Sequence, residues 1–156
     1  MSEDSDVSEV PPDAHPAVWM SIDTTRIAIE NASIGMAVLD PATGVFLEVN
    51  QALCDFLGRD RQTLRGINWQ TLTHPDDLPA DQRKVELLRE GRIDSFTSRK
   101  RYLMPDGAVV WGDLSLAGVR DAGGALTVVI AQIVDATEAV EARRALMVHA
   151  TGYPLA

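Results

Sequence analysis

The sequence predicts an α+β domain, in which a five-stranded antiparallel sheet carries short helices on one face and has a flanking helix at each end. Five segments have the composition of β-strands. Tight turns separate neighbouring strands, except where a helical stretch interrupts the middle of the chain, and this order is typical of antiparallel α+β domains. A chain of 156 residues suits one such domain and needs neither disulfides nor metal to form a core.

The N-terminal region predicts a tail followed by a helix. Residues 1–17 contain five acidic residues, no Lys or Arg, and three prolines, a composition that buries too little apolar surface to order itself. This segment is therefore expected to be a disordered acidic tail. Over residues 18–31, Trp19, Ile22 and Ile29 recur at helical spacing, which predicts an amphipathic flanking helix.

The core is expected over residues 32–135, where turn residues such as Pro105-Asp106-Gly107 divide the strands. The expected strands are Gly35–Asp40, Val45–Asn50, Ser95–Met104, Ala108–Arg120 and Leu126–Val134. The expected helices between the second and third strands are Ala52–Leu57, a turn at Arg61–Arg65, and Asp81–Glu90.

A further helix is expected over residues 136–148, followed by a linker or tail at 149–156. Asp135 stands at the N-cap position, and Glu138 follows three residues later, beyond Thr137. This spacing is that of a capping box, in which the two side chains satisfy backbone N–H groups at the start of a helix.

Composition excludes several classes of function. The formal net charge of −9 argues against nucleic-acid binding, which requires a clustered basic face. The single cysteine, Cys54, excludes an internal disulfide and a multi-cysteine zinc site, and the three histidines lack metal-ligand spacing, so no metal is expected. No apolar run is long enough to span a membrane, and the acidic start does not resemble a signal peptide, so a cytoplasmic location is expected.

Four motifs in order resemble the PAS domain family, specifically the PAS/PAC sensor domains of bacterial signalling proteins. They are FLEVNQALCDFLGRDRQTLRG (46–66), LTHPDDL (72–78), RKRYLMPDGAVVWGDLSLAGVRD (99–121) and IVDATEA (133–139). The resemblance covers roughly residues 26–147. It implies a sensor that binds a small ligand between sheet and helices, dimerises, and controls an attached effector such as a diguanylate cyclase or histidine kinase. Because Met1 resembles a natural start, the effector is expected beyond the last helix.

Strand alternation, together with the resemblance, predicts an apolar pocket under the sheet. The pocket is expected to hold a small apolar molecule, or to be collapsed without a ligand. Asn50 has a second interpretation as the N-cap of the helix that follows it. The expected pocket residues are Asn50, Phe56, Trp69, Tyr102, Gly112, Leu114, Leu116, Ala131 and Ile133.

The resemblance also predicts that neither flavin nor haem is bound. Light-sensing relatives hold flavin with side-chain amides, and the matching positions here are Tyr102, Gly112 and Ile133. Trp69 stands where those relatives have a reactive cysteine. Haem-binding relatives use a histidine on the helix before the third strand, and no histidine occurs from Leu78 to Met104.

The opposite sheet face predicts a docking surface. Trp111, Val128, Ile130 and Val134 form an apolar patch there, and such patches are usually covered. The stripe of Trp19, Ile22 and Ile29 could cover it within one subunit or across a homodimer, the most common symmetric assembly.

For the remaining polar residues, a structural role is expected in preference to a catalytic one. Asp76 and Asp77 are expected to cap the next helix, and a small enzyme using one of them as a base in the cavity is a remote alternative. Lys100 is expected to point inward and to pair with Asp76, Asp77 or Glu48.

Where the last strand leads into the last helix, Asp135, Thr137 and Glu138 are expected to transmit sheet movement to that helix. A ligand-free dimer scaffold is the main alternative to a sensor; the domain itself is not expected to be an enzyme.

Overall fold

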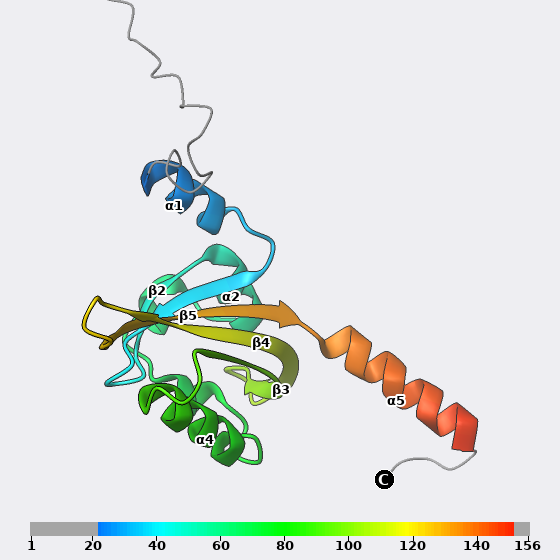
Figure 1. The fold of residues 1–156 in the computed structure, drawn as a ribbon. Coiled ribbons are helices and arrows are strands. Elements are labelled where there is room, and N and C mark those ends of the chain that lie inside the picture. The colour runs from blue at the N-terminus through cyan, green and yellow to red at the C-terminus, as the bar shows by residue number, and fades with distance from the viewer. Residues whose placement is uncertain (1–21, 152–156) are drawn as a thin grey trace, which may run out of the picture.

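The computed structural model describes residues 22–151, so the predicted tail at 1–17, Trp19 and residues 152–156 lie outside the described part. One antiparallel sheet has the strand order β2-β1-β5-β4-β3 (Figure 1). Its strands are β1 (Gly35–Leu39), β2 (Phe46–Val49), β3 (Ser95–Leu103), β4 (Val109–Arg120) and β5 (Leu126–Asp135). The predicted five-stranded antiparallel sheet is confirmed.

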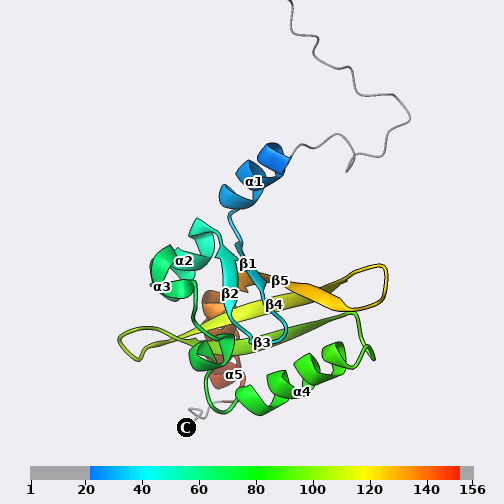
Figure 2. The ribbon, with the colours of Figure 1, turned by 90° about the vertical axis from the view of Figure 1, so that its left-hand side faces the viewer.

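The helices between β2 and β3 lie on one face of the sheet and divide the interior into two halves (Figure 2). They are α2 (Gln51–Leu57), α3 (Arg61–Leu64), the 3₁₀ helix η2 (Trp69–Leu72) and α4 (Leu78–Arg89). Helices α2 and α3 pack on β1 and β2 and form the α2–α3 half of the interior, whereas α4 packs along β3 and forms the α4 half.

The core lies between these helices and the inner face of the sheet. On β5, Val129, Ala131 and Ile133 are at most 5% exposed, in alternation with residues that face outward. Gly112 of β4 lies under the Tyr102 ring so closely that an added Cβ would come within 2.6 Å of Tyr102 Cε2. Glycine is therefore needed at this position for the ring to pack against the sheet.

Several element boundaries differ from the sequence prediction, most of them by one residue. Helix α4 begins at Leu78 rather than Asp81, because Pro79 lies in the first turn, where its missing N–H has no intrahelical partner to lose. Helix α2 begins at Gln51 rather than Ala52. The 3₁₀ helix η2 was not predicted; Asn68 caps it by accepting a hydrogen bond from Gln70 N.

The flanking helices are α1 (Ile22–Glu30) and α5 (Thr137–Thr151). The end of α1 is held on the helical side of the sheet, because Asn50 Nδ2 donates to Ile29 O at 2.9 Å and Glu30 forms an ion pair with Arg61 of α3. The described part of α1 therefore does not cover the outer face of its own sheet, and the other predicted possibility, coverage by the helix of a partner subunit, stays a prediction. Ile29 is 38% exposed.

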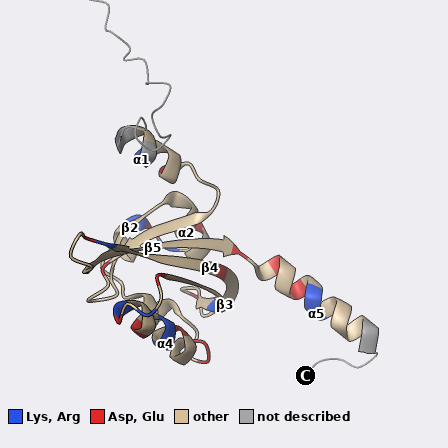
Figure 3. Ribbon diagram, in the orientation of Figure 1, with Lys and Arg blue, Asp and Glu red and all other residues tan. Residues whose placement is uncertain are grey.

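Helix α5 projects away from the sheet (Figure 1). Ala136 and Val140 are buried at its base, whereas Leu146 is 71% exposed. Charged side chains gather along α4 and the first turns of α5, while β1 carries none and β5 carries only its last residue, Asp135 (Figure 3). No described helix is both long and apolar enough to cross a membrane.

Candidate functional site

A small cavity of about 30 Å³ lies in the α4 half, between α4 and the inner face of β3, β4 and β5. Space of this size holds one or two waters. Its walls are mostly apolar, but the charged residues Asp81 and Lys100 also line it. The pocket residues expected from sequence that do line the cavity are Trp69, Tyr102, Leu114, Leu116, Ala131 and Ile133.

Three other expected pocket residues, Asn50, Phe56 and Gly112, lie outside the cavity wall. The Tyr102 ring covers Gly112, and Phe56 packs edge-on against the far side of that ring, with 5.5 Å between centroids. Asn50 uses its whole amide elsewhere: Oδ1 accepts from Met36 N and Leu53 N, and Nδ2 donates to Ile29 O and Ile34 O. Asn50 therefore caps α2 and has no amide valence left for a ligand.

The centre of the site is a buried ion pair between Lys100 on β3 and Asp81 on α4. Lys100 Nζ lies 2.6 Å from Asp81 Oδ2, and the two residues are 3% and 2% exposed. Lys100 Nζ also donates to Thr73 Oγ1 at 3.0 Å and lies over the Trp69 and Tyr102 rings, about 5 Å from each centroid. Ser98 Oγ donates to Asp81 Oδ1 at 3.0 Å.

The prediction that Lys100 points inward and needs an anion agrees with this geometry, but the three partners proposed for it are wrong. Asp81 is absent from the predicted partners because the sequence prediction makes it the first residue of a helix and assigns it no contact with the sheet. Its spacing held the signal, since Asp81, Val85 and Leu88 recur at i, i+4 and i+7, the positions of one helix face.

Burial sets the electrostatics of this site. Burial lowers the pKa of the Lys100 ammonium, and the Asp81 carboxylate opposes that shift. Burial raises the pKa of the Tyr102 hydroxyl far above its usual range. An ion pair in such surroundings offsets the cost of removing each charge from water, and loss of either partner leaves the other uncompensated.

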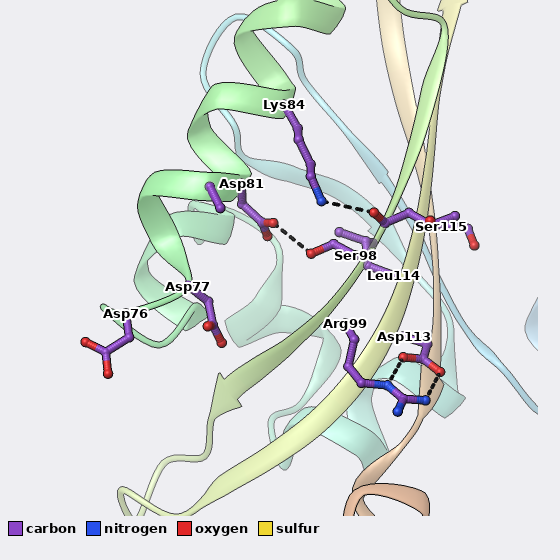
Figure 4. Close-up of a pocket in the computed structure, with 11 residues that line it drawn as sticks. Asp76, Asp77, Asp81, Lys84, Ser98, Arg99, Asp113, Leu114 and Ser115 are labelled. Carbon is purple, nitrogen blue, oxygen red and sulfur yellow. Dashed lines mark hydrogen bonds and ion pairs between the residues drawn. The ribbon is translucent and has the colours of Figure 1, made fainter.

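Outside the cavity, an open groove of about 620 Å³ runs between α4 and the strands β3 and β4 (Figure 4). Asp81 and Leu114 belong to both the groove and the cavity, so the Asp81–Ser98 hydrogen bond closes the wall between them. Lys84 Nζ donates to Thr97 O across the groove at 3.1 Å, and Arg99 pairs with Asp113 at its floor.

Asp77 occupies the N-cap position of α4, but its carboxylate makes no capping hydrogen bond. It accepts instead from Arg101, through Nε at 3.0 Å, Nη2 at 2.8 Å and the backbone N at 2.8 Å. These bonds from Arg101 hold the pKa of Asp77 below its usual range. The capping role predicted for Asp77 is wrong, because a bidentate guanidinium on the sheet edge binds this carboxylate more strongly than a backbone amide.

The exit from the sheet combines residues from two strands. Asp135 Oδ1 accepts from Thr137 N at 2.9 Å, which gives an Asx turn rather than the predicted bond to Glu138 N. Ala136 N donates to Trp111 O at 2.8 Å, and Trp111 N donates to Thr137 Oγ1 at 2.9 Å. The start of α5 is thus hydrogen-bonded to β4 as well as continuous with β5.

The outer face of the sheet is partly covered by charged side chains of the same chain. Arg101 and Arg144 lie against the Trp111 ring, 5.3 and 5.7 Å from its centroid. Val128 and Ile130 are half-buried, and Val134 is 47% exposed. The apolar patch predicted from the sequence is therefore open at its β5 end.

The cavity residues offer little to a metal, flavin or haem. Among residues 22–151, no three His, Cys, Asp or Glu side chains lie close enough to hold a metal ion. The cavity wall contains no amide side chain, histidine or cysteine. Cys54 is buried in α2, outside that wall, and burial raises the pKa of its thiol. The wall therefore lacks the side-chain amides and the histidine that flavin- and haem-binding relatives use, and the expectation that neither cofactor is bound stays a prediction.

Comparison with known proteins gives consistent matches. A family model described as the PAS domain matches residues 33–138. The chain is 42% identical over 113 residues to the probable diguanylate cyclase DgcE of Escherichia coli (strain K12). That match covers 72% of this chain and 10% of DgcE, so the chain spans about a tenth of the length of this curated relative.

Solved structures share the fold. The PAS domain of a protein from Colwellia psychrerythraea superposes with a TM-score of 0.68 at 17% identity, over 74% of this chain and 97% of that one. An RNA-binding Light-Oxygen-Voltage receptor superposes with a TM-score of 0.73 at 23% identity, over 92% of this chain and 41% of that one. At these identities the likeness shows the fold alone.

Proposed function

The chain belongs to the PAS domain family, and we propose that it is the sensory and dimerisation module of a bacterial signalling protein whose effector follows α5. The similarity to a short part of a probable diguanylate cyclase supports an effector of that class, and a histidine kinase is the alternative. In this proposal the domain carries no catalytic chemistry: Asp77, one candidate base, is already bound by Arg101, and Asp76 is exposed.

The observation that carries the proposal is the junction of α5 with β4. Two hydrogen bonds join Trp111 to Ala136 and Thr137, and Arg144, two turns further on, lies over the Trp111 ring. The rest of α5 is largely exposed, and a 15-residue helix is marginal by itself. The position of α5 therefore depends on β4, and a shift of this strand would move the helix.

The junction can be tested with Thr137→Val, which removes the hydroxyl that accepts from Trp111 N. We expect faster hydrogen exchange over the first turn of α5, unchanged exchange over β5, and loss of effector control in the full-length protein. Asp135→Ala removes the bond to Thr137 N and should produce a smaller effect in the same region. Thr127→Val on β5 is the matched control, because its hydroxyl bonds only within the β4–β5 hairpin. Unchanged exchange in α5 and normal effector control in Thr137→Val would show that the junction does not couple them.

Dimerisation is proposed through the outer face, where Ile130 and Val134 leave apolar surface open. A two-fold partner could cover this surface, with its own α1 or its own sheet. We expect sedimentation to show a dimer at tens of micromolar, and Val134→Asp to shift it to monomer. Ala122→Asp, in the exposed β4–β5 turn, adds the same charge away from this face and should leave the dimer intact.

The cavity is proposed to bind a small, mainly apolar ligand. Its apolar walls support this, whereas its volume of about 30 Å³ favours the second candidate, a ligand-free dimer scaffold. Native mass spectrometry of the purified protein separates the two, since a retained small molecule supports sensing and a bare protein favours the scaffold.

A further inference from the structure

Two polar atoms at the cavity in the α4 half lack hydrogen-bond partners among the described residues. The Tyr102 hydroxyl is one, in a residue that is 4% exposed. Asp81 Oδ2 is the other: its one described contact is the 2.6 Å ion pair with Lys100 Nζ, and a carboxylate oxygen can accept a further hydrogen bond. Both residues line the cavity. Buried polar groups nearly always have a hydrogen-bond partner, so these two atoms indicate which hydrogen bonds a bound molecule would supply.

The charge of the site decides what kind of molecule would satisfy them. Lys100 and Asp81 neutralise one another, so a charged ligand would bring an uncompensated charge into an apolar interior. A carboxylate accepts only, and a tyrosine hydroxyl can donate. A single group that donates to the carboxylate and accepts from the tyrosine hydroxyl satisfies both atoms, and a hydroxyl group does both.

We propose that this cavity binds a small neutral molecule with a hydroxyl group, whose oxygen accepts from Tyr102 and whose hydrogen is donated to Asp81 Oδ2. The apolar remainder of the ligand would contact Leu39, Phe46 and Val85. The proposal rests on the sensory function proposed above and names the chemical class of its ligand.

The size of the cavity links binding to movement. About 30 Å³ accommodates the hydroxyl end of a ligand, and a second void of about 20 Å³ lies behind Leu39, Trp69, Val85 and Leu116, which border both spaces. Val85 belongs to α4, so a ligand with an apolar body would merge the two voids by displacing this helix. The Asp81–Ser98 hydrogen bond marks the entrance from the outer groove.

Phenol and toluene provide a matched pair of probes, because they have the same number of heavy atoms and differ only by hydroxyl and methyl. NMR titration of the whole chain should show saturable shifts at Tyr102, Leu114 and Ile133. We expect phenol to bind about tenfold more tightly than toluene, the factor that one or two net hydrogen bonds provide. In Tyr102→Phe the preference should fall to about threefold or less, with toluene affinity unchanged. Thr127→Val removes a hydroxyl group on β5, outside the cavity wall, and should keep the wild-type preference.

Three results would overturn the proposal. They are equal affinity for phenol and toluene, a phenol preference that survives in Tyr102→Phe, and a crystal structure in which an ordered water occupies the cavity and phenol does not displace it. The outcome is independent of the α5 junction. If phenol is not preferred but Thr137→Val still loses effector control, only the ligand proposal is refuted. If phenol is preferred but Thr137→Val keeps normal effector control, only the proposed coupling of β4 to α5 is refuted.

Discussion

The two halves of the interior bury polar groups in different ways. In the α2–α3 half, Leu53, Leu57 and Leu64 are fully buried, and the one fully buried polar side chain there, Asn50, makes four hydrogen bonds. In the α4 half, Lys100 and Asp81 form a buried ion pair beside a cavity, and the Tyr102 hydroxyl there has no hydrogen-bond partner among residues 22–151. The buried amide of the α2–α3 half has all its hydrogen bonds, whereas the α4 half has unused hydrogen-bonding capacity.

The two halves also differ in whether their buried polar side chains bond to backbone atoms or to other side chains. Asn50 bonds only to backbone atoms, from α1, the following loop, β1 and α2, so its amide fixes the path of the chain. Asp81 bonds to side chains, those of Lys100 and Ser98, and Lys100 to Thr73. Side chains can exchange partners without unfolding the backbone. The α4 half is therefore where an occupant could change the structure.

The largest expected effect is the loss of one partner of the ion pair. Asp81→Ala leaves the Lys100 ammonium buried and uncompensated, and should lower the free energy of unfolding by about 3–5 kcal/mol in urea titrations. The double variant Asp81→Leu with Lys100→Met removes both charges and should recover most of this loss. If the double variant is as unstable as Asp81→Ala, packing rather than charge holds α4 in place.

In the α2–α3 half, removal of the buried polar side chain should lower the free energy of unfolding by a smaller amount. Asn50→Ala leaves the backbone N–H groups of Met36 and Leu53 without their acceptor, and because only the Leu53 bond is fully buried, we expect a loss of about 1–3 kcal/mol. Hydrogen exchange should increase at those two amides and stay unchanged in α4. Exchange that increases equally in both halves would show that the interior behaves as one unit.

Much of the fold could be predicted because it depends on local signals. The β3–β4 turn has Pro105-Asp106-Gly107, the strands alternate, and Gly58 ends α2 in the left-handed conformation. The predicted start of α4 is three residues late because Pro79, which reads as a helix breaker, lies in the first turn of the helix. The direction of α1 could not be predicted, since it depends on Arg61 and Asn50, distant in sequence.

The candidate site was only partly predictable, because some of its contacts join residues that are distant in sequence. Strand alternation identified Leu114, Ala131 and Ile133 as inward, because it needs only the local backbone. Pairing Lys100 with Asp81 required knowing that α4 turns its Asp81–Leu88 face to β3. The capping role given to Asp77 failed because a tertiary partner, Arg101, replaces the local bond that spacing suggested. At the start of α5, Asp135 Oδ1 accepts from Thr137 N rather than from Glu138 N.

A smaller effect is expected at the outer boundary of the α4 half. Arg101 lowers the pKa of Asp77 in the folded state, so the stabilisation is present above the unfolded pKa and is lost as pH falls through the folded value. Asp77→Asn should be less stable than wild type at pH 7, and the difference should shrink in acid. Asp94→Asn, at an exposed position before β3, controls for the loss of a negative charge. A difference that is constant with pH would contradict the ion-pair origin.

The smallest effect, and the one of opposite sign, belongs to Tyr102. Truncating a buried polar group that is bonded, as at Asn50, costs stability, whereas removing one that has no partner relieves a desolvation penalty. Tyr102→Phe keeps the ring that packs on Gly112 and Phe56 and removes only the hydroxyl. We expect the free energy of unfolding of the ligand-free protein to stay the same or rise by up to about 1 kcal/mol. Urea titration with Tyr153→Phe as the reference measures it. A loss above about 1 kcal/mol would mean that the hydroxyl is already hydrogen-bonded in solution, and the two halves of the core would then be equally complete.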